Sequence, residues 1–439
     1  MPLDRTGPAA GRPAPAHPAG PLPPLPPSLW ESREVQEAVR DQAPGAVVAA
    51  ARRAHGLRQD ELGALAGFSQ SAVSRLESGS NIAFDLRVLR PLQRLLGIPA
   101  HLLGLADGGP APGARRPGQV PPGFADALDG LVGVDVDALM ALTGAAVAGG
   151  PLTPDALSRL MVLRRVLNEA HDRRGSGPLI PTARAMHDFV DALRRSARGG
   201  QRRELLVIAS AYAELLGWLH AESGDPRGAS RWTWRALELG QAADDRDAVA
   251  HAHVSLSRLA EAEGDVDRVL GLARAASRAR GLSPVVRAIS LGQEARGLAL
   301  AGDQSCMDRL DRAAAEYARG EAHTGDEYRI GYCFTADHVE VERAACWLEL
   351  GEAGRAIEVY EEVQQRLWRR MCVWEQGMHS AKRAHAHAMA GDVEVAASLG
   401  YAALDAARAT RSALVLRELG RLGQWEGAPE VAELARGVG

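Results

Sequence analysis

The polar side chains best suited to specific hydrogen bonding lie close together in the N-terminal quarter of the chain. They are Gln59, Ser69, Gln70, Ser71, Ser74 and Arg75. Ser69 is a good helix N-cap, and we expect Gln70, Ser71 and Ser74 on the exposed face of the helix that it begins. Short hydroxyls and amides suit base edges in the major groove of DNA, and a guanidinium suits a phosphate or a base. The stretch therefore has the chemistry of a surface that binds nucleic acid.

Short helices must position these side chains. Five are expected, namely Pro44 to Gly56, Gln59 to Ala66, the residues after Ser69 up to Gly79, Asp85 to Leu96, and a short helix opened by Pro99. The sequence Ala66-Gly67-Phe68 predicts a tight turn that sets the second and third helices at a steep angle. The apolar residues spaced to clamp these helices together are Leu62, Leu65, Val73 and Leu76.

The segment 58–79, RQDELGALAGFSQSAVSRLESG, resembles the Cro/λ-repressor-type helix-turn-helix of the XRE family. The resemblance extends over about sixty residues and includes the turn, the polar third helix and the two helices that follow. It implies an all-α fold in which residues 44–105 form a five-helix, λ-repressor-like DNA-binding domain.

The same resemblance assigns roles to individual residues. It implies that Gln59 contacts a backbone phosphate and braces Gln70, and that Arg75 reaches a phosphate or a base. Arg52 and Glu77 occupy the positions of a buried interhelical ion pair in relatives, which implies a structural role for both.

Charge is distributed unevenly along the chain. The whole protein has a formal net charge of −4, whereas residues 44–105 contain seven arginines and only four acids. A basic segment on an acidic remainder indicates one end that binds a polyanion. The alternative is a helical bundle kept only for protein contacts, and the excess of arginine around the polar third helix argues against it.

The length of 439 residues predicts two or more domains. Residues 1–43 are expected to be a Pro/Ala-rich, mostly disordered tail, although residues 30–41 could form a short helix. Residues 106–124 read as a Gly/Pro linker and residues 125–201 as a helical connecting region. The remaining domain, residues 202–439, contains an internal repeat.

Glycine–acid pairs mark this repeat. They are Gly224-Asp225, Gly264-Asp265, Gly302-Asp303, Gly351-Glu352 and Gly391-Asp392. Each glycine can end one helix in the left-handed conformation, and each acid can begin the next. Small residues seven positions before each glycine allow antiparallel helices to approach closely, which predicts a solenoid of helical hairpins. The offsets resemble the tetratricopeptide repeat (TPR), although all four spacings, of 40, 38, 49 and 40 residues, exceed its period of about 34 residues.

No arrangement of residues typical of an enzyme is present. The sequence contains no P-loop, GxSxG or HExxH motif, so we expect no catalytic residues and no cofactor. The cysteines form no CxxC pair and have no histidine at zinc spacing, which predicts buried thiols and no metal site. These cysteines are Cys306, Cys333, Cys346 and Cys372. No apolar run reaches membrane-spanning length, so no membrane partner and a cytoplasmic location, with association to the nucleoid through DNA, are expected.

Together these patterns favour a sequence-specific, DNA-binding transcriptional regulator whose helix-turn-helix reads a double-stranded operator. A DNA-binding domain of about sixty residues covers only one half-site of an operator, so a homodimer is expected. The TPR-like domain would dimerise, sense an effector or recruit a partner. Some TPR-containing regulators hold peptides through asparagines; residues 202–439 contain none, which favours a protein or small-molecule effector. The alternative is a TPR-type protein-interaction scaffold without specific DNA binding.

Overall fold

The computed structural model describes residues 22–40, 43–78, 86–103, 153–321, 330, 334–368, 371–425, 427–428 and 431. Within these ranges the regular structure is entirely helical. The chain divides into two compact units, Met1–Gly108 and Gly109–Gly439. The predicted linker, residues 106–124, and the start of the predicted connecting region lie outside the described residues.

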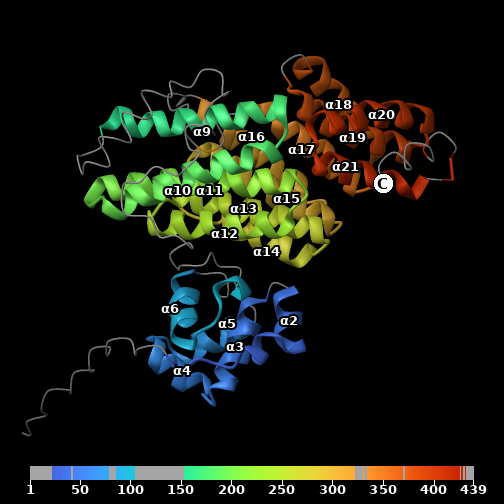
Figure 1. Ribbon diagram of the computed structural model, residues 1–439. Coiled ribbons are helices and arrows are strands. Elements are labelled where there is room, and N and C mark those ends of the chain that lie inside the picture. Colours follow the sequence, from blue (N-terminus) through green and yellow to red (C-terminus); the bar gives the residue numbers. More distant parts are fainter. Residues whose placement is uncertain are drawn as a thin grey trace, which may run out of the picture. The chain divides into compact units, whose positions relative to one another are not determined.

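The N-terminal unit contains seven helical elements in its described part (Figure 1, blue to cyan). They are α1 (Pro27–Trp30), α2 (Arg33–Arg40), α3 (Pro44–Ala54), α4 (Gln59–Ala66), α5 (Gln70–Glu77), α6 (Leu86–Leu96) and the 3-10 helix η2 (Ala100–Leu103). The last five correspond to the five helices expected from the sequence, the fifth being a 3-10 helix. Proline at the first position of α3 supplies a preset φ where no N–H partner is needed.

The core of this unit is aliphatic. The side chains at its centre are at most 1% exposed, and they are Val47, Val48, Leu62, Val73, Leu76, Leu89, Leu92 and Leu96. Leu65, which we expected in this clamp, is only half-buried. Two helices, α1 and α2, lie inside the segment 1–43 that the sequence assigned to a mostly disordered tail. Helix α2 packs against α3 and buries Val35 and Ala38, so part of that segment belongs to the domain.

The second unit begins, in the described residues, with α9 (Pro154–Arg174), η3 (Gly177–Leu179) and α10 (Ile180–Ser196). Five antiparallel pairs follow (Figure 1, green to red): α11 (Gly199–Glu222) with α12 (Pro226–Ala242), α13 (Arg246–Glu263) with α14 (Val266–Ser277), α15 (Pro284–Leu300) with α16 (Cys306–Glu321), α17 (Ala336–Glu349) with α18 (Ala353–Leu367), and α19 (Val373–Ala390) with α20 (Val393–Thr410). Helix α21 (Ala413–Gly420) and η4 (Arg421–Trp425) complete it.

The repeat glycines act as the sequence predicts. All five lie at positive φ, between +74° and +90°, at the end of the first helix of each pair. Asp225 and Asp265 then cap the next helix through their side chains, accepting from backbone N–H groups at 2.8 and 3.0 Å. Glu352 and Asp392 occupy the cap position without such a bond, contrary to expectation. The carboxylate of Asp392 instead lies 3.3 Å from His387 Nδ1.

The first helices of successive pairs pack side by side, α13 against α15 and α15 against α17. The end of the unit then packs back on its beginning, because α19 and α20 contact α9, and α21 contacts α11. Tyr212 ties α11 to α9 by donating its hydroxyl to the Leu160 carbonyl at 2.6 Å. The helical pairs are therefore joined both to their neighbours and across the unit.

Candidate nucleic-acid interface

The turn between α4 and α5 depends on two glycines. Gly67 ends α4 in the left-handed conformation, at φ +76°, where a side chain would be strained. Gly63 lets the backbone of the turn approach α4, since a Cβ there would lie only 2.7 Å from the carbonyl oxygen of Phe68. Ser69 then caps α5 by accepting from the N–H of Ala72 at 3.2 Å. Local sequence therefore sets the direction in which α5 leaves the turn.

Helix α5 buries one face and presents the other to solvent. Val73 and Leu76 hold it in the core, at no more than 1% exposure. On the outer face the residues Ser69, Gln70, Ser71 and Arg75 are exposed, as expected. Ser74 differs from the expectation, because its side chain is half-buried. The predicted contact residues thus share one surface, with Ser74 at its edge.

A series of hydrogen bonds, which we call the Gln70 relay, connects this surface to the interior. Gln70 Nε2 donates to Gln59 Oε1 at 2.9 Å, and Gln59 Nε2 donates to Glu77 Oε2 at 2.9 Å. Arg52 completes the series by donating to both oxygens of Glu77, at 2.6 and 2.9 Å. The relay consists of side chains from α3, α4 and α5, so it fixes the three helices relative to one another.

The ion pair at the inner end of the relay is well shielded. The side chains of Arg52 and Glu77 are 12% and 8% exposed. Arg52 also donates to the Leu57 carbonyl at 2.7 Å. Its hydrogen bonds to Glu77 raise the pKa of the guanidinium, against the opposing effect of burial. The guanidinium therefore remains charged, and each group satisfies the hydrogen bonds of the other in a place where water has little access.

Two arginines near the surface are already engaged. Arg58 pairs with Asp60 at 2.9 Å at the start of α4. Arg53 of α3 pairs with Glu34 of α2. The Arg53–Glu34 pair was not expected from the sequence, because residues 1–43 were not assigned to the folded domain. Arg75 donates to the Ser71 carbonyl at 3.2 Å, so its exposed guanidinium lies along α5.

Comparison with known families agrees with this geometry. Residues 45–105 match the family model described as a helix-turn-helix domain. No curated protein matches the chain. The protein thus contains a helix-turn-helix domain, which suggests DNA binding, and this domain is followed by a long region of paired helices.

The described residues contain neither a cluster suited to a metal ion nor a membrane-spanning helix. No group of three or more histidine, cysteine or acidic side chains in these ranges could hold a metal ion. No helix in the described ranges is long and apolar enough to cross a membrane. Cys306 and Cys346 are buried free thiols and Cys372 is half-buried, whereas Cys333 lies outside the described residues.

Proposed function

We propose that this protein is a sequence-specific transcriptional regulator of the XRE, Cro/C1-type helix-turn-helix class. The observation that carries the proposal is the exposed polar face of α5, whose first side chain, Gln70, is oriented by the relay. A side chain held in one orientation before binding loses less entropy when it contacts a base. A helix with such a face is the element that a helix-turn-helix inserts into the major groove.

The contacts can be assigned by their position. Gln70 and Ser71, in the first turn of α5, are placed to reach base edges, and Ser74 follows them at the edge of the surface. The N-terminus of α5, capped by Ser69, presents backbone N–H groups to a phosphate. Gln59 and Arg75 flank this region and would bind the phosphate backbone or, for Arg75, a base.

The rest of the chain has a different role in this proposal. One helix-turn-helix domain covers one half-site. A homodimer therefore provides the second domain and reads an operator with two half-sites. The paired helices of the second unit form a TPR-like domain that mediates dimerisation or responds to an effector. The protein acts as a cytoplasmic binding protein rather than an enzyme.

The test is a selection of binding sites from random double-stranded DNA, followed by titration of the selected sequence against a scrambled one. We expect the selected site to bind about 10³-fold or more tightly than the scrambled DNA. The affinity should also fall steeply with salt, because arginines displace counterions from phosphates. A protein that selects no sequence and binds DNA weakly at low salt would instead be a TPR-type scaffold.

The dimer is tested separately by light scattering of residues 106–439. A dimer at micromolar concentration would assign dimerisation to the second unit. A monomer would assign it to the helix-turn-helix domain or to DNA.

A further inference from the structure

Two buried cysteines meet where neighbouring helical pairs pack together. Cys306 is the first residue of α16, and Cys346 lies near the end of α17. Both are fully buried in one apolar core, and a hydrogen bond joins their thiols. Neither residue belongs to the polar surface of α5 or to the glycine–acid repeat, so the proposed function does not account for this contact.

The hydrogen bond makes the two thiols unequal. Cys346 donates it, which lowers the pKa of the Cys306 thiol against the opposing effect of burial, and the backbone N–H of Met307 at the start of α16 lowers this pKa further. The same hydrogen bond, together with burial, raises the pKa of the Cys346 thiol. The thiolate is the reactive form of cysteine, and it is favoured at helix N-termini. Cys306 is therefore the more nucleophilic sulfur, and Cys346 is a neutral thiol held against it.

Only a short turn of the chain separates Cys306 from solvent. Residues 301–304, which precede α16, are exposed, and the Cys306 Sγ lies 3.7 Å from the carbonyl oxygen of Gln304. A side-chain hydrogen bond holds this turn, since Asp303 accepts from the N–H of Ser305 at 2.9 Å. Exposed turns open locally at a smaller cost in free energy than the whole fold. A small oxidant can therefore reach Cys306 when the turn opens.

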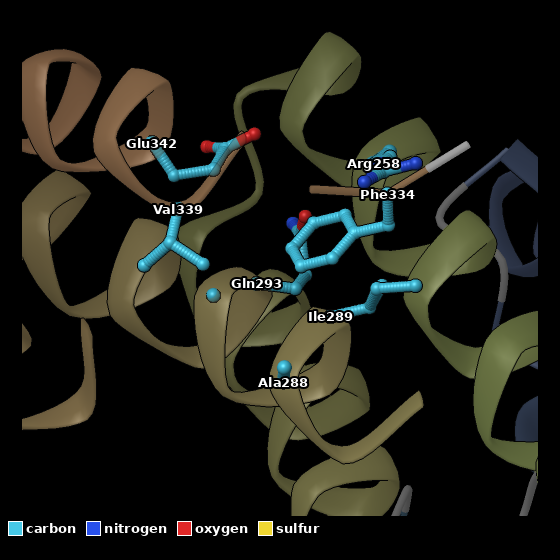
Figure 2. A pocket seen from close by; sticks show the side chains of 8 residues that line it. Arg258, Ala288, Ile289, Gln293, Phe334, Val339 and Glu342 are labelled. Atoms are coloured by element: carbon cyan, nitrogen blue, oxygen red, sulfur yellow. The ribbon is translucent and has the colours of Figure 1, made fainter. Parts of the chain in front are cut away.

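The inner side of the same core is closed more tightly. Val339 of α17, which packs in the core with both cysteines, also faces a small hollow between α13, α15 and α17 (Figure 2). This hollow has room for about one water molecule. The turn before α16 is therefore the more open route to the thiols.

We propose that Cys306 and Cys346 form a reversible disulfide when the protein meets hydrogen peroxide. The Cys306 thiolate attacks one oxygen, the O–O bond breaks, and the departing hydroxide takes up the proton that Cys306 had released, forming water. Cys306 is then a sulfenic acid. The Cys346 sulfur attacks the Cys306 sulfur, the S–O bond breaks, and the hydroxide leaves with the Cys346 proton as a second water. Two thiols thus lose two electrons in total, and one peroxide is reduced.

A dithiol reductant reverses the reaction by thiol–disulfide exchange. Disulfides in reducing compartments are usually transient and redox-sensing, which fits a pair that is reduced in the resting protein. The proposal concerns the second unit and does not depend on DNA binding.

The disulfide would act on the longest step of the repeat, which runs from Gly302 to Gly351. It would join the start of α16 to the end of α17, the two ends of this step. Closing it brings the sulfurs to about 2.05 Å, so this part of α17 is drawn toward α16. Arg296 of α15 donates to the carbonyl of Ala345, next to Cys346, at 3.0 Å, so the contact between α15 and α17 must adjust as well. The redox state of one pair of thiols thus affects the packing of three helices.

The first experiment treats the reduced full-length protein with hydrogen peroxide, blocks the remaining thiols with N-ethylmaleimide and maps disulfides by mass spectrometry after digestion without reduction. We expect the main link to join Cys306 to Cys346 and to disappear on treatment with dithiothreitol. The circular dichroism spectrum before digestion should be that of the reduced, folded protein. The proposal is overturned if no such link forms in the folded protein, or if Cys333 or Cys372 provides the main one.

The second experiment assigns the attacking and the resolving thiol in serine variants treated with peroxide and dimedone, which labels sulfenic acids. In Cys346→Ser the sulfenic acid of Cys306 has no thiol to react with, so Cys306 should be labelled. In Cys306→Ser the link should be lost and Cys346 should stay unlabelled.

Cys372→Ser is the matched control, because Cys372 is half-buried and caps α19 by accepting from the N–H of Glu375 at 3.5 Å. It should form the link between Cys306 and Cys346 as the parent does. Loss of the link in Cys372→Ser, or the absence of label on Cys306 in Cys346→Ser, would contradict the proposed reaction.

Discussion

The side chain of Gln70 shows how a surface contact is prepared from inside the domain. Its amide nitrogen is bonded to Gln59, which is in turn bonded to Glu77. The amide oxygen and the second N–H remain for an adenine edge, which accepts and donates in the same pairing. The interior Arg52–Glu77 pair therefore contributes to recognition indirectly. Arg52 holds the Glu77 carboxylate, which accepts from Gln59 and so orients it.

We expect Gln70→Ala and Arg75→Ala each to weaken operator binding, by about 1–3 kcal/mol for a lost bidentate base contact. Both side chains are exposed, so the melting midpoint should be unchanged. Fluorescence anisotropy with the selected operator at fixed salt measures the first effect, and thermal melting the second. Binding equal to that of the parent would remove α5 from the interface.

Arg52 and Arg58 of the helix-turn-helix domain should behave differently on removal. Arg52→Ala strands Glu77 in a shielded site and should destabilise the helix-turn-helix domain by about 1–3 kcal/mol, the cost of a buried group left unsatisfied. Arg58→Ala removes a pair whose arginine is 72% exposed, and such surface pairs contribute about 0–1 kcal/mol. Hydrogen exchange of backbone amides in α3 and α5 of the full chain reports both. Equal protection in the two variants would show that the Arg52–Glu77 pair does not stabilise the domain.

At the scale of elements, single residues that act within one turn of the chain predicted most of the helix ends that such local interactions determine. The bounds of α4 and α5 follow from Gly67 and from the cap at Ser69, both of which act within one turn of the chain. The repeat glycines likewise end helices by their own φ preference. The capping of α18 and α20 was not predicted correctly, because a cap competes with other partners, such as His387 for Asp392. The sequence did not place α2 in the folded domain, because only two buried side chains, rather than a regular apolar pattern, attach it to α3.

Close helix approach within a pair can be tested by adding one methyl group. Gly217→Ala would place Cβ 2.6 Å from Thr233 Oγ1, whose hydroxyl donates to the Ala229 carbonyl at 2.8 Å. We expect a loss of about 1–3 kcal/mol from overpacking between α11 and α12. Gly271→Ala, with open space around it, should instead gain about 0.5–1 kcal/mol from helix propensity. Chemical denaturation of the full chain measures both, and changes of the same sign would contradict this account of the small-residue positions.

At the scale of the whole repeat unit, the contacts that join its two ends could not be predicted from the sequence. Ser412 donates to Glu222 Oε2 at 2.5 Å, although the two residues are 190 positions apart. Gly175 approaches the same region, since a Cβ there would lie 2.3 Å from the Thr410 carbonyl oxygen. Neither residue belongs to a motif or a period. Such contacts depend on the accumulated rotation of five helical pairs, which no local pattern encodes.

The carboxyl group of Glu222 gives these contacts a pH dependence. Its side chain is fully buried, and burial raises its pKa, only partly offset by the Ser412 hydroxyl and by His171. An acid whose pKa is higher in the folded state binds its proton more tightly there. Its contribution to the free energy of unfolding is therefore largest at low pH and decreases as pH rises above the ordinary glutamate value of about 4.3.

We therefore expect Glu222→Gln, which replaces the carboxyl by a neutral group of the same shape, to remove this decrease. Denaturation of parent and variant at pH 5 and pH 8 should show the stability of Glu222→Gln relative to the parent increasing with pH. Glu204→Gln, an exposed position on the same helix α11, is the control and should show no such trend. A difference between Glu222→Gln and the parent that stays constant from pH 5 to pH 8 would mean that Glu222 is ionised in the folded protein. Burial would then be outweighed by charges such as that of Arg417, and the contacts between the two ends would be insensitive to pH.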